Sequence, residues 1–175
     1  MAIYSYKNYL PKLADDCYIA PGVQIIGRIE LNSKVSVWHN CVLRGDVNDI
    51  IIGQNTNIQD LSMLHVTEEK SLIIGENVTI GHSVTLHACD IGDNSLIGMG
   101  AIVLDGAVIP PYSIVAAGSV VAPGKIFPTK SMIMGSPARV TRELRDNEID
   151  MLNNHYKSYL RYAADFKNKE IIKKL

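Results

Sequence analysis

The sequence predicts an all-β solenoid of short strands that ends in one α-helix. The 175 residues include 22 Ile and 14 Val but only 2 Phe and 1 Trp, and β-branched side chains favour strands. Aliphatic residues recur at every sixth position over most of the chain, a period too short for a helix and its turn. Many of the 13 Gly residues directly follow such a position, as expected at the corners between short strands.

The six-residue period defines the inward-facing positions of the predicted coil. With a slip of three residues, one longer break and a slip of one residue, these anchors are Ile19, Ile25, Leu31, Val37, Leu43, Ile52, Ile58, Leu64, Ile74, Ile80, Leu86, Ile91, Ile97, Val103, Ile109, Val115 and Val121. Three hexads, each a strand and a corner, close one triangular coil and bury the anchors on one axis. Ordinary alternating strands would not return a glycine directly after the anchor, as happens at Gly53, Gly75, Gly81, Gly92 and Gly98.

The C-terminal part of the chain has a different pattern. From about Thr141 the period of six ends, and apolar residues recur at helical spacing, namely Ile149, Leu152, Tyr156, Tyr159, Leu160, Ala163 and Phe166. We therefore expect a β-helix domain over residues 1–140 and a helix over residues 141–175 that packs on the coil. Residues 124–137 are interpreted as a connecting turn because of their Gly and Pro residues.

Charge and composition exclude several classes of partner. The net charge is −1, with 17 basic and 18 acidic residues and no Lys/Arg block, so the footprint of a nucleic-acid or anionic-membrane partner is missing. No leader pattern and no run of 18 apolar residues occurs. Cys17, Cys41 and Cys89 are widely spaced, which is typical of reduced thiols, with Cys41 as a small core residue. We expect a cytoplasmic protein.

Stacking of the coils predicts one polar column. Residues three hexads apart lie above each other at about 4.8 Å, the spacing of neighbouring strands. Arg44, His65 and His87 each directly follow an anchor, and these anchors are one coil apart. We therefore expect these three side chains along one corner.

A second polar column predicts contact between subunits. His39, Asp60 and His82 each lie two residues after an anchor, again one coil apart. His82 is one hexad before His87, around a different corner, so it cannot reach the His65 and His87 pair of its own chain. A second copy packed alongside could supply its His82, and three copies would close a ring with three equivalent sites. The spacing thus predicts a homotrimer.

Three imidazoles with an open fourth position are typical of a catalytic zinc site. Fe²⁺ or Co²⁺ would suit the same ligands, and the metal would lower the pKa of bound water to about 7 and so supply hydroxide. Any single histidine is better explained as a surface or corner residue, but three in register favour a metal. His39 and His155 lack this support and are interpreted as ordinary residues.

Three segments carry a family resemblance. Residues 38–47 (WHNCVLRGDV), 57–65 (NIQDLSMLH) and 80–89 (IGHSVTLHAC) resemble the signature of gamma-class carbonic anhydrases, which belong to the hexapeptide-repeat family. The resemblance covers nearly the whole chain, including GSPAR at residues 135–139. It implies a left-handed coil, and zinc held by His65 and His87 of one subunit and His82 of the next.

The resemblance also implies roles for residues around the metal. Arg44 and Asp46 would form an interface ion pair, while Gln59 and Asp60 would contact the metal-bound water or orient a ligand. Gln59 can donate from its amide nitrogen, and Asp60 can accept an imidazole N–H and fix its tautomer. For Arg44 and Asp46 the alternative is a surface pair worth at most about 1 kcal/mol.

Two further candidates are a residue that transfers protons and a residue of the last helix that lies over the metal. Archetypal members carry acidic loops that relay protons, whereas here Val47 follows Asp46 and the break after Leu64 is short. Glu68 is our candidate shuttle, the alternative being a solvated loop charge. The family places a Tyr or Asn of the last helix over the metal, and Tyr159 is our candidate before Tyr156, with plain helix packing as the alternative.

The function that follows is reversible hydration of carbon dioxide by metal-bound hydroxide, a carbonic anhydrase-like lyase activity. One alternative is an acyltransferase or thioesterase acting on acyl-coenzyme A, since many hexapeptide-repeat proteins use a histidine base at a subunit interface. The other is a non-catalytic metal-binding or assembly protein, which the short loop favours.

Overall fold

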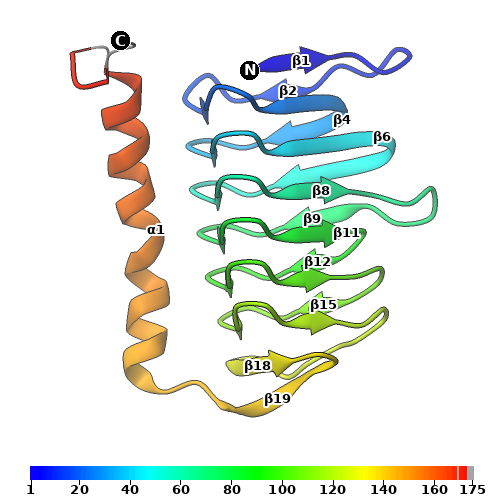
Figure 1. The fold of residues 1–175 in the computed structure, drawn as a ribbon, viewed down its shortest axis with the longest axis vertical. Helices are drawn as coiled ribbons and strands as arrows, with labels where there is room; N and C mark the ends of the chain where they lie inside the picture. The colour runs from blue at the N-terminus through cyan, green and yellow to red at the C-terminus, as the bar shows by residue number, and fades with distance from the viewer. Residues whose placement is uncertain (169, 173–175) are drawn as a thin grey trace.

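A computed structural model describes residues 1–168 and 170–172 of the chain. The strands stack into three long faces around one axis, and a single helix runs along the outside (Figure 1). The fold is therefore the predicted parallel β-helix with a C-terminal helix. Residues 169 and 173–175 of the predicted helical region lie outside the described residues.

The first face is a sheet of eight strands. It contains β3 (Tyr18–Ile19), β5 (Ser36–Val37), β7 (Asn57–Ile58), β10 (Thr79–Ile80), β13 (Leu96–Ile97), β16 (Ile114–Val115), β18 (Ser131–Gly135) and β19 (Ala138–Glu143). All neighbours in it are parallel except β18 and β19, which pair antiparallel.

The other two faces belong to one sheet of eleven strands. Two long strands, β4 (Gln24–Leu31) and β6 (Val42–Ile52), run through both faces and join them. One face adds β1 (Ala2–Tyr4), β8 (Met63–His65), β11 (Thr85–His87), β14 (Ile102–Val103) and β17 (Val120–Val121). The other adds β2 (Lys12–Leu13), β9 (Leu72–Ile74), β12 (Asp90–Ile91) and β15 (Val108–Ile109).

The predicted anchors form the core. Ile25, Leu43, Ile58, Leu64 and Leu86 have no exposed surface and line the axis. At some corners a glycine must follow the anchor because successive coils approach closely there. A Cβ atom added to Gly53 would lie 2.5 Å from the carbonyl carbon of Gly75, one coil further.

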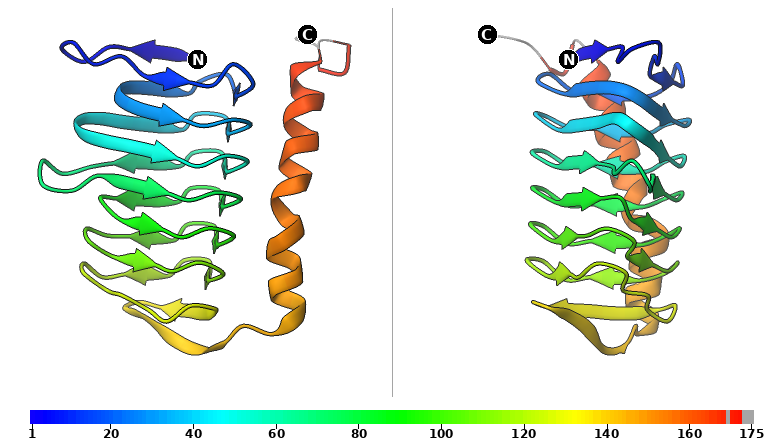
Figure 2. Two further views of the ribbon diagram at one scale, coloured as in Figure 1. Left: turned by 180° about the vertical axis from the view of Figure 1, so that it is seen from behind. Right: turned by 90° about the vertical axis from the view of Figure 1, so that its right-hand side faces the viewer.

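The helix α1 (Asp146–Lys167) runs back along the coil from its C-terminal end to its N-terminal end (Figure 2). Glu148 caps its start, with Oε2 accepting the Arg145 backbone N–H at 2.8 Å. Leu152 and Ala163 are buried, which anchors the helix on the coil. No helix in the described part of the chain combines the length and apolarity needed to cross a membrane.

The boundary between coil and helix differs from the prediction in two ways. The helix begins at Asp146 and not near Thr141, because residues 138–143 form β19 and pair with β18. Residues 124–137 are not only a turn, since residues 131–135 form β18. That strand continues the eight-stranded face on β16 and buries Ile133 completely in the core.

Candidate metal centre

The first polar column lies on adjacent strands of one face. Arg44 of β6 pairs with His65 of β8, and His65 pairs with His87 of β11. The predicted stacking of the three residues is thus confirmed. Nδ1 of His65 lies 3.0 Å from Nε2 of His87, and their ring centroids are 5.0 Å apart.

A carboxylate contacts the far nitrogen of each of these two rings. Nε2 of His65 is 3.0 Å from Oδ1 of Asp46, and Nδ1 of His87 contacts Oδ1 of Asp105. An ionised carboxylate only accepts hydrogen bonds, so a neutral ring at either position carries its proton on this far nitrogen. The two nitrogens that face each other therefore both carry lone pairs, an arrangement that a cation between them would satisfy.

Burial favours the neutral form of the His65 ring. Burial lowers the pKa of the His65 imidazole below its ordinary value, against the opposing effect of the hydrogen bond to Asp46. For Asp46, burial raises the pKa, but the hydrogen bonds from His65 and Arg44 outweigh it and hold the pKa below its ordinary value. A neutral imidazole beside an ionised carboxylate is the state in which histidine binds a metal.

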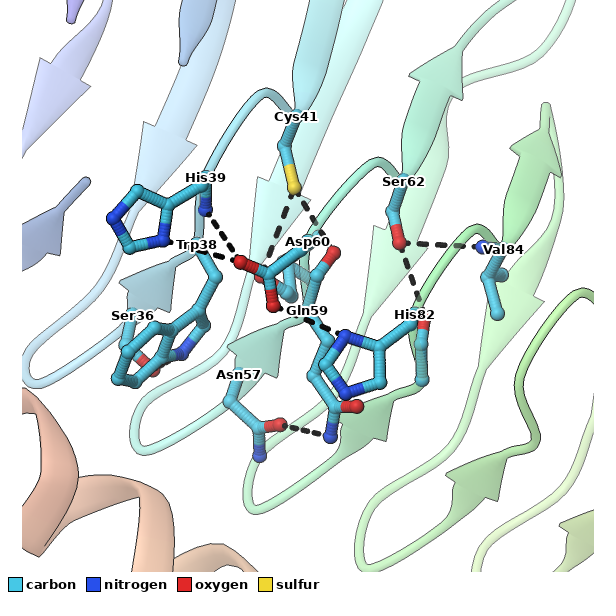
Figure 3. A network of polar contacts seen from close by, with 12 residues as sticks. Ser36, Trp38, His39, Cys41, Asn57, Gln59, Asp60, Ser62, His82 and Val84 are labelled. Carbon is cyan, nitrogen blue, oxygen red and sulfur yellow. Dashed lines mark hydrogen bonds and ion pairs between the residues drawn. The ribbon is translucent and has the colours of Figure 1, made fainter. Parts of the chain in front are cut away.

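The third predicted ligand, His82, follows β10 at another corner. Its Nδ1 lies 3.0 Å from Oδ2 of Asp60, while Oδ1 of Asp60 accepts from His39 (Figure 3). The second predicted column is thereby confirmed as a contact chain. His82 is 43% exposed at its side chain, and its Nε2 is the ring nitrogen that Asp60 does not occupy.

The donor set fits a divalent metal ion. Two Zn–N bonds of 2.0–2.1 Å at a tetrahedral angle place the nitrogens about 3.3 Å apart, close to the 3.0 Å between His65 and His87. Each of the three histidines also has the carboxylate partner that metal-binding histidines usually have. Within one chain, no group of three or more His, Cys, Asp or Glu among the described residues could hold a metal, since His82 is at a separate corner.

The remaining predicted residues divide between the two corners. Arg44 pairs with Asp46 of its own strand, so this ion pair forms within one chain. Gln59 is 3% exposed and donates to Oδ1 of Asn57 at 3.3 Å. Glu68 lies exposed in the loop between β8 and β9, where its carbonyl accepts from Asn48.

Tyr159 is on the same side as His82. Together with Trp38, His39, Asp60, His82, Tyr162 and Phe166 it lines a cavity of about 310 Å³. Burial, and secondly the charge of Asp60, raise the pKa of its phenol, so Tyr159 is a protonated donor at neutral pH. Tyr159 also packs edge-on against Trp38, with ring centroids 5.7 Å apart, and it joins Gln59 and His155 in lining a second cavity of about 480 Å³ beneath α1.

Sequence reasoning missed Asp105 and left His39 without a role. Asp105 lies in the coil that follows His87, at the same corner, so an acidic residue one coil beyond a ligand was the available signal. For His39 the signal was its place in the column of Asp60 and His82.

Fold and site define a hexapeptide-repeat β-helix protein with a pair of facing histidines at one corner of the coil. Residues 88–123 match the family model described as "Bacterial transferase hexapeptide (six repeats)". The chain is 44% identical over 165 residues to a carbonic anhydrase of Geobacillus kaustophilus, covering 94% of this chain and 91% of that protein. The chain belongs to the gamma carbonic anhydrase family.

Two further proteins are similar to this chain over most of its length. The mitochondrial gamma carbonic anhydrase 2 of Arabidopsis thaliana is 39% identical over 159 residues, which cover 87% of this chain. This chain spans only 57% of the length of that plant protein. The crystal structure of a hexapeptide transferase family protein from Anaplasma phagocytophilum superposes with a TM-score of 0.90 at 37% identity, covering 93% of this chain and 96% of that one.

Proposed function

We propose that this protein is a zinc-dependent, carbonic anhydrase-like enzyme that hydrates carbon dioxide reversibly to bicarbonate. The observation that carries the proposal is the pair of His65 and His87, whose facing nitrogens lie 3.0 Å apart while their far nitrogens each contact a carboxylate. Two lone pairs this close repel each other, and a cation bound between them would remove that repulsion. The carbonic anhydrases among its relatives support the reaction.

The site is completed by a neighbouring subunit of a homotrimer. His65 and His87 supply two ligands from one corner, and His82 lies at another corner, with Asp60 on its Nδ1. Its Nε2 is left to serve the pair of the next subunit. Three copies related by a three-fold axis make three equivalent sites.

When bound, Zn²⁺ lowers the pKa of a water molecule at its open position to about 7, and Fe²⁺ or Co²⁺ are further candidates for the same ligands. The residues of the chain hold the ligands in place. Asp46, Asp60 and Asp105 fix the tautomers of the three imidazoles. Arg44, 45% exposed beside His65, balances the charge of Asp46 and presents a cation to bicarbonate.

Three further residues act on substrate and proton. Gln59 orients the substrate through its amide, and Tyr159 offers a phenol proton beside Asp60 and His82. Glu68, exposed in its loop, accepts the proton that the reaction releases and passes it to buffer.

Stopped-flow hydration of carbon dioxide by the zinc and ferrous forms tests this function. The His87→Ala variant should lose most of the activity because one of three ligands is gone. His155→Ala removes a histidine of α1 that contacts Thr79 of β10, and this control variant should bind the metal as the wild type does. Equal hydration rates for His87→Ala and the wild type would contradict the proposal.

An acyltransferase or thioesterase acting on acyl-coenzyme A is the second candidate. The family model and the Anaplasma structure carry transferase names, and the cavity of about 480 Å³ beneath α1 is lined mainly by apolar residues. Turnover of acyl-coenzyme A that survives removal of the metal by a chelator would favour this candidate. Full metal occupancy with neither activity would instead identify a non-catalytic metal-binding or assembly protein.

A further inference from the structure

We propose that His39 is a positioning residue that fixes Asp60 and, through it, the metal ligand His82. The inference rests on the proposed function, because it takes His82 as a ligand of the neighbouring subunit's metal. It goes beyond that function in giving the His39 side chain and the last turn of α1 a part in the metal site.

The geometry of Asp60 carries the inference. One carboxylate oxygen, Oδ1, accepts from the His39 backbone N–H at 3.2 Å and faces its Nδ1 at 3.1 Å. The other oxygen, Oδ2, lies 3.0 Å from Nδ1 of His82, as Figure 3 shows. His39 therefore holds the carboxylate by one oxygen and leaves the second to hold His82.

A fixed carboxylate determines which nitrogen His82 presents. A carboxylate accepts only, so His82 carries its proton on Nδ1 and keeps the lone pair on Nε2. Asp60 is 33% exposed and His82 43% exposed, so both side chains border on solvent and need a partner to stay ordered. Without the side-chain donor of His39, only the backbone N–H still holds Oδ1, so Asp60 is freer to turn toward water and His82 to rotate with it.

The end of α1 holds His39 in its turn. The ring of Phe166, in the last helical turn, lies edge-on to His39 with centroids 5.9 Å apart. The ring of Trp38 packs against both of these rings, with its centroid 6.4 Å from that of His39 and 5.1 Å from that of Phe166. The helix begins at the opposite end of the coil (Figure 1), and its C-terminal turns, with Tyr159 and Tyr162 as well as Phe166, line this corner.

Two substitutions separate the donor of His39 from its ring. In His39→Asn the amide nitrogen is the same number of bonds from Cα as Nδ1 of histidine, so the donor to Asp60 remains while the ring is lost. His39→Phe keeps an aromatic ring against Phe166 and Trp38 and the backbone N–H to Asp60, but it has no side-chain donor. A packing role predicts that the Phe variant is the milder one, and a positioning role predicts the reverse.

The experiment measures zinc affinity of the full-length protein, stripped of metal, by competition with a chromophoric chelator. We expect His39→Phe to bind Zn²⁺ about tenfold more weakly, at the lower end of the effect of outer-shell partners, and His39→Asn to stay within about twofold of the wild type. A second readout needs no metal: ring ¹⁵N chemical shifts should show the Nδ1–H tautomer of His82 in the wild type and His39→Asn, and a mixture in His39→Phe. Thermal unfolding of both variants establishes that they are folded.

His82→Ala serves as the reference that distinguishes the two failures. If His82→Ala weakens zinc binding while His39→Phe does not, the role of His39 is overturned and the metal site stands. If His82→Ala binds zinc as tightly as the wild type, the proposed intersubunit site is wrong, and the positioning role falls with it. A weaker His39→Asn beside an unaffected His39→Phe would assign His39 to packing.

Discussion

The carboxylates that contact the far ring nitrogens of His65 and His87 should strengthen metal binding, and their removal should weaken it by a measurable factor. Asp46→Asn and Asp105→Asn each keep an oxygen that can accept a hydrogen bond but remove the charge that favours the metal-binding tautomer. Outer-shell partners of this kind are worth about 10- to 100-fold in metal affinity, or about 1.4 to 2.8 kcal/mol. The two sites differ in exposure, since the Asp46 side chain is 17% exposed and that of Asp105 is 50% exposed.

Exposure sets the order of the two effects. Water screens the charge of Asp105 more strongly, so we expect about tenfold weaker zinc binding for Asp105→Asn and nearer 100-fold for Asp46→Asn. Chelator competition at one fixed ionic strength measures both. Asp49→Asn makes the same change of charge at an exposed residue of β6 and should bind zinc like the wild type. Wild-type affinity in Asp46→Asn, or a larger loss in Asp105→Asn, would refute the reasoning.

Three further predictions concern stability and proton transfer. Leu64 is completely buried, so Leu64→Ala should lower the free energy of unfolding in urea by about 2–5 kcal/mol; a loss below about 1 kcal/mol would contradict the packed axis. Glu148 has its pKa lowered from 4.5 to about 2, first by Arg142 and then by the backbone N–H of Arg145; its contribution to stability is therefore present above pH 4.5 and lost as the pH falls toward 2. Glu148→Gln should flatten the acid limb of the stability curve in that window, and an unchanged limb would speak against the ion pair. Glu68→Gln should slow hydration in dilute buffer and recover in concentrated buffer, whereas equal rates in dilute buffer would remove Glu68 from the proton path.

The coil could be predicted because its period is a direct consequence of its packing. Each anchor, such as Ile58 or Leu86, has to be aliphatic and fully buried, and the next residue is small where coils approach closely, as at Gly53. The end of the coil could not be placed in this way. Residues 131–135 continue a face without a complete hexad, and β19 reverses direction to pair with them.

The candidate site was predictable where it follows the register of the coil. Arg44, His65 and His87 are in register because their strands are neighbours. Contacts made by side chains in the turns were harder to predict, since side-chain direction decides them. The contact of Asp105 with His87 and that of His39 with Asp60 both depend on turn geometry, which spacing alone does not specify.

Recombination of two inactive variants tests most directly whether each metal site is shared between subunits. His82→Ala and His87→Ala chains, prepared separately, should each lack tightly bound zinc and hydration activity. Unfolded together in equal amounts and refolded, about three-quarters of the trimers are mixed and each contains one complete site of three. Because one site in three is complete in three-quarters of the trimers, we expect recovery of about one quarter of the wild-type zinc content and activity. A mixture no more active than the separate variants would contradict it.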